Sequence, residues 1–230
     1  MPEKRFSEAH LEQYTLAVSH RLEKIKERIV RSGGDVDLVT IVAVTKTFGL
    51  DAVIAAHRAG IVDIGENYAD ELVEKATALN LAVPDHRVRW HFLGGIQRNK
   101  INRLSGLVGL YEGLDRYEEG EAIARRVPGA SVLVEVDTAR ISGRGGVVVE
   151  AVPELVRRLE GLGLLVEGLM TVAPPCGGES AVAAFRSVTT LRAELGLGVA
   201  SMGMSEDLEF AVAEGSTMIR VGRALFGPRP

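Results

Sequence analysis

The sequence predicts an α/β protein: one (β/α)8 barrel of the TIM type, with an extra helix before its first strand. Three observations support this fold. Eight short apolar runs are rich in β-branched residues, helical patterns lie between most of them, and their starts recur at the length of one βα unit. We therefore expect a single domain over residues 1–230, in which residues 1–34 form the extra helix packed on the barrel.

The predicted strands share a composition rich in Val, Ile and Leu and are bounded by turn residues. They span 38–45, 61–64, 89–93, 107–111, 131–136, 164–170, 198–202 and 217–221. A doubly wound open sheet is the competing architecture, but no GxGxxG motif follows a strand, which favours the barrel. The Gly/Pro cluster at 173–179 is interpreted as a loop, with a domain boundary there as the alternative.

Helices are indicated by apolar residues that recur every three or four positions. In the extra helix these residues are Leu11, Tyr14, Val18, Leu22, Ile25 and Ile29. Pro153 lies near the start of a later helix, and another apolar stripe stops at Gly196. Ser205 is expected to cap a last helix, which Gly215 would end.

Composition excludes several classes of protein. Hydrophobic residues make up 46% and charged residues 25%, which is typical of a soluble globular protein. With a net charge of -4 and no block of basic residues, we expect no nucleic-acid partner. The longest charge-free stretches are shorter than the roughly 20 residues that span a bilayer, so we expect no membrane association. The single cysteine, Cys176, is typical of a cytoplasmic protein. Separately, we expect the protein to be a monomer.

Lys46 is the first candidate functional residue, because it follows the apolar run LVTIVAVT. In a parallel barrel the active face lies at the C-terminal ends of the strands. Burial there disfavours the ammonium form and leaves an amine that can attack aldehydes. The alternative is a strand-end lysine that extends to solvent.

The second and third strands add polar residues. The segment IGENYADE places Glu66, Asn67 and Tyr68 at the same rim, where Asn67 can hydrogen-bond an oxygen of a flat ligand. Alternatively, Asn67 caps a helix over 67–79. His91 is interpreted as a core histidine with a satisfied hydrogen bond rather than an acid or base, and no ligand spacing supports a metal site.

The last two strands each end in a glycine and a candidate helix start. Backbone N–H groups at such starts attract phosphate, and these two loops often supply that site in barrels. Ser205, Gly222 and Arg223 would then hold a phosphate. The alternative is that Gly203 and Gly222 only permit tight turns.

An amine facing a phosphate site suits a phosphorylated aldehyde, and pyridoxal 5'-phosphate (PLP) is the commonest cofactor of that kind. Arg220 and Gly222 point to one face of the last strand. If that face is inward, Arg220 meets the pyridine nitrogen of the cofactor and keeps it unprotonated. An ion pair of Arg220 with Glu135 or Asp137 is the alternative.

Five segments together resemble one known family, the pyridoxal phosphate homeostasis proteins (YggS/PROSC family). These are IVAVTK, IGENYADEL, WHFLGGIQRNK, GLMTVAP and SMGMSEDLEFAVAEGSTMIRVGRALFG. The resemblance implies a barrel like the N-terminal domain of alanine racemase, which is fold type III among PLP proteins. It also implies a Schiff base between PLP and Lys46, with Asn67 and Met204 beside the ring, Arg220 at its nitrogen, and Ser205 with Gly222 on the phosphate.

The sequence departs from the family pattern in three places. Thr47, Phe48 and Gly49 follow the lysine where relatives continue with lysine and proline. Arg223 replaces a threonine or serine, and either supplies a guanidinium contact instead or points away. The 138–147 loop, TARISGRGGV, is an altered version of a loop that in relatives holds a glutamate, a serine and a lysine, so its role is open.

The resemblance implies a protein that binds PLP and buffers it, or delivers it to PLP-dependent apoenzymes, in vitamin B6 homeostasis. The alternative is a PLP-dependent amino-acid racemase of low activity. Racemases need an acid or base on each face of the substrate. The resemblance to alanine racemase implies that one of them is a tyrosine supplied with the help of an added β domain. No such domain is expected after Pro230, so we expect weak turnover or none. A third possibility is a cofactor-free aldolase whose lysine attacks a sugar phosphate.

Overall fold

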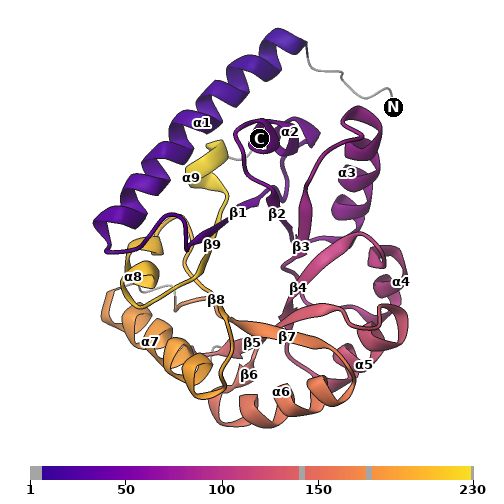
Figure 1. The fold of residues 1–230 in the computed structure, drawn as a ribbon, viewed down its shortest axis with the longest axis vertical. Helices are drawn as coiled ribbons and strands as arrows, with labels where there is room; N and C mark the ends of the chain where they lie inside the picture. Colours follow the sequence, from indigo (N-terminus) through magenta and orange to yellow (C-terminus); the bar gives the residue numbers. More distant parts are fainter. Residues whose placement is uncertain (1–6, 140–142, 175–177, 229–230) are drawn as a thin grey trace.

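Eight parallel strands close into a barrel in the computed structural model, which describes residues 7–139, 143–174 and 178–228. The strands are β1 (Thr40–Val44), β2 (Asp63–Glu66), β3 (Arg89–Phe92), β4 (Val108–Leu114), β5 (Ser131–Asp137), β7 (Leu165–Met170), β8 (Val199–Ser201) and β9 (Met218–Val221). Pairing of β4 with β5 and of β1 with β9 completes the ring seen in Figure 1. The predicted barrel is confirmed, and a short strand β6 (Val147–Val148), which the sequence did not indicate, pairs with the end of β5.

Helices form the outer layer of the barrel (Figure 1). They are α2 (Leu50–Arg58), α3 (Ala69–Ala82), η1 (Arg98–Lys100), α4 (Ile101–Leu104), α5 (Tyr117–Arg126), η2 (Val149–Ala151), α6 (Val152–Gly161), α7 (Gly178–Glu194), α8 (Leu208–Ala213) and α9 (Arg223–Phe226). Pro153 lies in the first turn of α6, where its missing N–H has no partner to lose. Cys176 lies outside the described residues.

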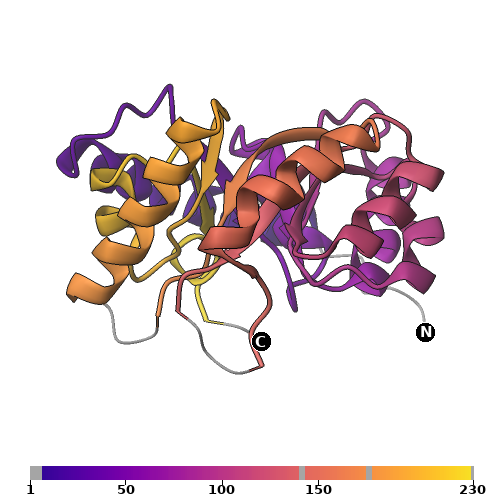
Figure 2. The ribbon, with the colours of Figure 1, turned by 90° about the horizontal axis from the view of Figure 1, so that it is seen from below.

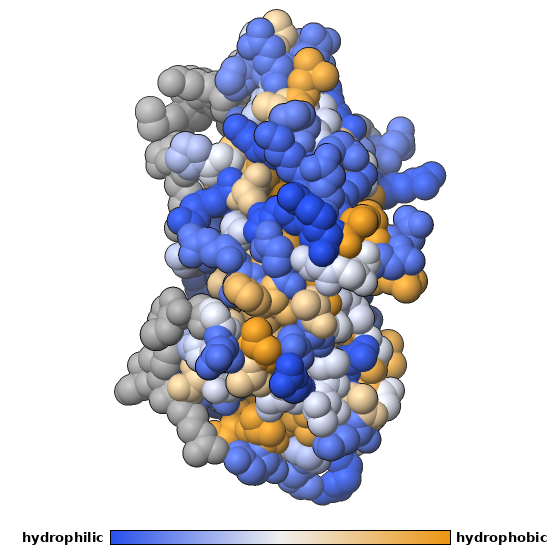
Figure 3. All heavy atoms as spheres, turned by 90° about the vertical axis from the view of Figure 1, so that its left-hand side faces the viewer, coloured by the Kyte–Doolittle hydropathy of each residue, from blue (hydrophilic) through white to orange (hydrophobic). Residues whose placement is uncertain are grey.

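The extra N-terminal helix is α1 (Glu8–Arg31), which packs across α2, α8 and α9. Its apolar stripe is buried as the periodicity predicts, except that Tyr14 is only half-buried. The Ser7 side chain caps the first turn by accepting a hydrogen bond from the His10 N–H. On its outer side, Figure 3 shows mostly hydrophilic residues with separate apolar patches. The helix therefore covers the barrel at the seam between the first and last strands.

Side chains alternate between the barrel interior and the layer under the helices, as the period of a strand requires. The interior holds a small apolar cluster of Val42, Leu110, Leu133, Met170 and Met218. A much larger core lies between the strands and the helices. The inward positions toward the C-terminal ends of β1, β8 and β9 include Lys46, Ser201 and Arg220, so the polar chemistry lies inside the barrel mouth.

The second strand begins two residues later than the sequence predicts. Gly60 has a φ of 91°, and the Ile61 N–H donates to the Ala56 carbonyl, so these residues still belong to the end of α2. As a result Glu66 lies within β2 rather than after it. Its side chain is fully buried on the helix side of the sheet, not at the rim.

Two predicted helix starts also differ. Helix α3 begins at Ala69, and neither Asn67 nor Tyr68 caps it with a side-chain hydrogen bond. Helix α8 begins at Leu208 after Asp207, whose carboxylate accepts a hydrogen bond from the Met204 N–H at 2.5 Å. Ser205 therefore does not cap α8, because that stretch of chain turns sharply before the helix begins.

The C-terminal ends of the strands share one side of the molecule. Figure 2 shows the chain that leaves β5 and β7 below the barrel, on the same side as the segment that follows β9. In the described residues no helix is long and apolar enough to cross a membrane.

Candidate functional site at the barrel mouth

The strand ends bring most of the predicted site residues to one rim. Lys46 follows β1, Asn67 follows β2, and Gly222 follows β9. Because β1 pairs with both β2 and β9, these residues lie on three neighbouring strands. Lys46, Asn67 and Gly222 are all half-buried. Strand β8 lies beside β9, so the loop that carries Met204 and Ser205 reaches the same rim.

Two close approaches fix this rim. A Cβ on Gly222 would lie 3.1 Å from the Val44 carbonyl oxygen, so the turn after β9 runs close against the end of β1. A Cβ on Gly94 would lie only 2.1 Å from the Asn67 carbonyl oxygen. The position of Asn67 therefore depends on a glycine in the neighbouring loop.

The backbone around Lys46 is held from outside the barrel by helix α3. Lys75 donates to the Thr45 carbonyl at 2.8 Å and to the Glu66 and Glu71 carboxylates at 2.6 and 2.9 Å. Glu71 in turn accepts a hydrogen bond from the Thr47 N–H. Sequence reasoning missed this cluster, although a lysine four residues after a glutamate on one helix face was a usable signal.

Arg220 points into the barrel and is 5% exposed. Its Nη1 donates to the Ser201 carbonyl and to Ser201 Oγ, both at 2.7 Å, and its Nη2 donates to the Thr171 carbonyl at 2.8 Å. Among the described residues it forms no ion pair with Glu135, one of the two partners considered from the sequence, although the Glu135 charge acts on it at longer range. Two of the five N–H groups of the guanidinium remain without an acceptor in the described chain.

His91 is buried in the interior, and its hydrogen bonds are satisfied as predicted. Its ring nitrogens lie 2.6 Å from Glu112 Oε1 and 2.9 Å from Asp63 Oδ1. Burial lowers the pKa of His91, but the two carboxylates outweigh it and raise the pKa above its ordinary value. Glu112 and Ser201 were not singled out from the sequence. Their inward parity on β4 and β8 was the only available signal.

The loops after β8 and β9 support each other. Ser205 Oγ accepts a hydrogen bond from the Ala224 N–H at 3.1 Å, so it caps α9 instead of α8. Arg28 of α1 donates to the Ser205 carbonyl at 2.9 Å and thereby ties the extra helix to this loop. The backbone N–H groups of Ser205 and Arg223 have no acceptor among the described residues.

Arg223 and Met204 lie toward the solvent. The Arg223 guanidinium pairs with the Glu206 carboxylate at 2.5 Å, and its side chain is 60% exposed. Of the two roles left open by the sequence, this structure has the guanidinium turned to a surface partner. Met204 is 38% exposed at the rim.

A carboxyl group at the mouth has a strongly shifted pKa. Burial, followed by the nearby charge of Asp115, raises the pKa of Glu135 to about 7, and the positive charge of Arg220 only partly opposes this. Glu135 is therefore a proton donor or acceptor near neutral pH beside the predicted site.

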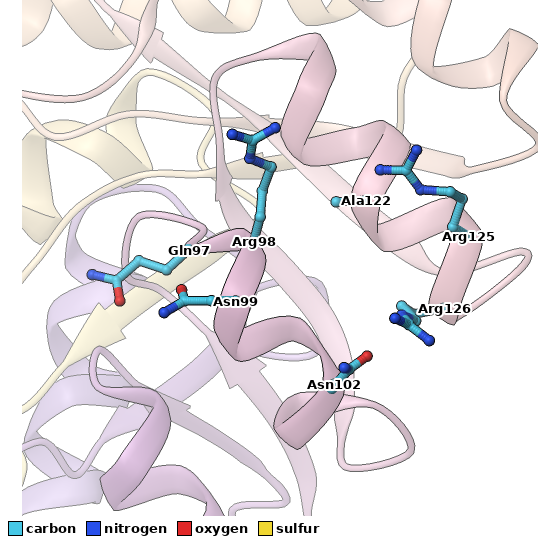
Figure 4. A pocket seen from close by; sticks show the side chains of 7 residues that line it. All are labelled: Gln97, Arg98, Asn99, Asn102, Ala122, Arg125 and Arg126. Atoms are coloured by element: carbon cyan, nitrogen blue, oxygen red, sulfur yellow. The ribbon is translucent and has the colours of Figure 1, made fainter.

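A groove of about 790 Å3 lies elsewhere, between η1, α4 and α5 (Figure 4). It is lined by Gln97, Arg98, Asn99, Asn102, Ala122, Arg125 and Arg126. These residues belong to the outer layer, so the groove is separate from the barrel mouth. In the part of the chain that the structure describes, no cluster of side chains has the make-up of a metal site.

Comparison with known proteins is consistent over nearly the whole chain. Residues 15–230 match the family described as the N-terminal domain of alanine racemase. The pyridoxal phosphate homeostasis protein of Pseudomonas aeruginosa is 35% identical over 90% of this chain and 91% of its own length. That of Deinococcus radiodurans is 36% identical over 92% of this chain and 100% of its own length. PipY of Synechococcus elongatus PCC7942, solved with PLP bound, has a TM-score of 0.78 and 28% identity over 91% of this chain and 100% of its own.

Proposed function

Since this chain belongs to the pyridoxal phosphate homeostasis proteins, which are built on the alanine racemase N-terminal domain, we propose that it binds PLP covalently at Lys46. It would buffer the cofactor, or deliver it to apoenzymes, within the cytoplasm. The observation that carries this proposal is the convergence of donor groups at the mouth. A half-buried lysine lies near a buried guanidinium with two N–H groups, and near two backbone N–H groups, that have no acceptor among the described residues.

These residues fit the charges of PLP. PLP would supply a reactive aldehyde, and the Lys46 amine is the group that would hold it covalently. Arg220 cannot accept a proton, and burial lowers its pKa while the charges of Glu112 and Glu135 oppose that change. It therefore offers a donor to the ring nitrogen, which must act as an acceptor there.

The opposite end of the site would hold the phosphate. Ser205 and Arg223 contribute backbone N–H groups, and Gly222 permits the chain to pass close to the end of β1. We propose that Arg223 acts through its backbone and leaves its guanidinium on Glu206. Asn67 and Met204 would flank the ring from the loops after β2 and β8.

The positions of Tyr111 and Tyr68, together with Arg220, support storage of PLP rather than racemisation of an amino acid. Tyr111 is 1% exposed and lies under the helices, where burial raises its pKa to about 12. Tyr68 follows β2 and is 55% exposed. Because Arg220 keeps its own proton, the ring nitrogen would stay unprotonated. An unprotonated ring makes the cofactor a weaker electron sink. This combination favours holding the aldehyde over abstracting a substrate proton.

We also propose that the protein acts as a monomer. Its exposed large apolar side chains come from several different elements and loops. They are Leu16, Val30, Leu38, Val62, Tyr68, Leu81, Val148, Leu165, Met204 and Phe210. Sedimentation equilibrium over a wide range of concentration would show one mass of about 24.7 kDa. A mass that doubles with concentration would contradict the monomer.

The test of function is to add PLP, reduce with borohydride and digest the protein. We expect the reduced adduct on the peptide that contains Lys46 and a spectrum that is bleached by the reductant. Lys46→Ala should remain folded and lose the adduct, because a rim lysine contributes little to the core. Lys100→Ala, a partly exposed lysine outside the mouth, serves as the matched control and should keep the adduct. An adduct that persists in Lys46→Ala would contradict the assignment.

A further inference from the structure

A line of hydrogen-bonded side chains crosses the interior of the barrel from Arg220 to Asp63. Arg220 donates to Ser201 Oγ at 2.7 Å, and Ser201 Oγ lies 2.6 Å from Glu112 Oε2. Glu112 Oε1 lies 2.6 Å from His91 Nδ1, whose other ring nitrogen meets Asp63. These residues come from β9, β8, β4, β3 and β2, so the line runs from the mouth to the beginning of a strand at the opposite end.

The direction of each hydrogen bond follows from which groups carry protons. Arginine only donates, so Ser201 accepts from Arg220 and gives its single proton to Glu112. Glu112 and Asp63 face both ring nitrogens of His91, and a neutral imidazole could donate to only one of them. Acceptance by both carboxylates requires an imidazolium at His91, and the raised pKa of His91 with the lowered pKa of Glu112 favours that form, in which the charges along the line alternate in sign.

Burial makes this arrangement consequential for Arg220. Ser201, Glu112 and His91 are 0% exposed, and only Asp63, with 18% of its side chain exposed, approaches solvent. Among the described residues Arg220 forms no direct ion pair, and one serine hydroxyl links it to Glu112, whose charge acts on it together with those of Glu135 and Asp207. That same hydroxyl, with two carbonyls, sets the orientation of the guanidinium and therefore the direction of its spare N–H groups.

We propose that Ser201 and Glu112, with His91 behind them, are positioning residues for the cofactor: they hold the Arg220 guanidinium oriented and charged toward the ring nitrogen. This inference rests on the proposed function. A purely structural role would instead affect the stability of the barrel and leave the electronic state of bound PLP unchanged.

The test compares two buried serines. Ser201→Ala removes the link between Arg220 and Glu112, whereas Ser216→Ala removes a buried hydroxyl whose partners among the described residues are the carbonyls of Ala200, Met202 and Met218. Titration with PLP should show roughly tenfold weaker binding and a shifted absorption band for Ser201→Ala, as expected for the loss of a hydrogen bond to a charged group. Ser216→Ala should match the wild type in both. Equal affinity and an unshifted band in Ser201→Ala would overturn the proposal.

A second measurement needs no cofactor. Nitrogen NMR of the His91 ring in the unliganded wild type should show both nitrogens protonated near pH 7. A neutral ring would overturn the alternating charges on which the proposal depends. In folded Glu112→Gln the ring should lose a proton. If the wild type formed no borohydride-reducible adduct, the proposed function would fail, whereas the NMR result would still report on the line itself.

Discussion

Thr47 donates its backbone N–H to Glu71 at 2.9 Å while its own φ is 68°, a left-handed conformation. In the described residues no other non-glycine residue has a positive φ. Burial raises the pKa of Glu71, but the Thr47 N–H and the Lys75 ammonium outweigh it and lower the pKa, so this carboxylate is an ionised acceptor. The strained residue directly after Lys46 is thus fixed by α3, which sets the path of the chain as it leaves the barrel.

Replacing Thr47 with glycine should stabilise the protein. A β-branched residue in the left-handed region is strained by roughly 1–2 kcal/mol, and the exposed Thr47 side chain has little packing to lose. Glycine also increases the conformational entropy of the unfolded chain, which offsets part of the relieved strain. We therefore expect a net gain of up to about 1 kcal/mol in the free energy of unfolding. Urea denaturation measures it. Thr47→Ala keeps most of the strain, and a glycine variant less stable than the alanine variant would contradict this prediction.

Removing the Lys75 ammonium should be strongly destabilising. Lys75→Met leaves Glu66 fully buried without its counter-charge, which should lower the free energy of unfolding by roughly 3–5 kcal/mol. Adding Glu66→Gln should recover part of that loss, because no buried charge then remains unpaired. Thermal or urea denaturation of the single and double variants measures the recovery. A double variant less stable than Lys75→Met would be inconsistent with the proposed pairing.

The Lys75→Met variant should also change its response to pH. Burial already raises the pKa of Glu66 in the wild type, and loss of the Lys75 charge raises it further. A folded-state pKa above the unfolded one means that the folded protein binds the proton more tightly, so stability falls as pH rises through that pKa. Acidification from neutral pH should therefore partly rescue Lys75→Met relative to the wild type. The difference between their denaturation midpoints at several pH values measures this effect.

Glu135 should make the stability of the wild type depend on pH near neutrality. Its folded pKa of about 7 exceeds its ordinary value of 4.5, so its contribution is complete below pH 4.5 and is lost as pH rises through about 7. Glu135→Gln cannot ionise and should exceed the wild type in stability at alkaline pH by an amount on the order of 1–2 kcal/mol. If the stability of the wild type and of Glu135→Gln depended on pH in the same way, the Glu135 carboxyl would be solvated and the prediction would be wrong.

The neighbouring glycines Gly94 and Gly95 should respond very differently to alanine. At Gly94 the new Cβ would overlap the Asn67 carbonyl, whereas at Gly95 it would meet nothing within 4 Å. We expect Gly94→Ala to lower the free energy of unfolding by roughly 2 kcal/mol and to weaken PLP binding, because the Asn67 loop must move. Gly95→Ala should be nearly neutral. Similar losses in both variants would mean that the close approach is unimportant.

Periodicity was sufficient for the barrel and for α1, because strand and helix faces repeat with different periods. It placed Leu22 and Ile29 in the core and all eight barrel strands within a few residues of their observed positions. The second strand was shifted because Gly60 and Ile61 still belong to the end of α2, and because a charged residue, Glu66, lies inside the strand. The Lys75 ammonium compensates the buried charge of Glu66, and this ion pair forms only when α3 packs against β2.

The candidate site was only partly accessible from the sequence. Strand ends located Lys46, Asn67 and Gly222, since the C-terminal ends of parallel strands share one rim. The sequence could not show that Ser205 caps α9, or that Glu112 and Ser201 lie behind Arg220. These relationships join residues far apart in the chain, and no local pattern encodes them.

The seam between β1 and β9 has a consequence for biosynthesis. During translation β1 emerges early, but Thr40 finds its partner Met218 only when nearly all of the chain has left the ribosome. Until then α1 lacks α8 and α9, and its apolar stripe has only α2 to cover it. The apolar stripe of α1 is thus incompletely covered during most of this synthesis, and its cover is complete only when α8 and α9 pack on it.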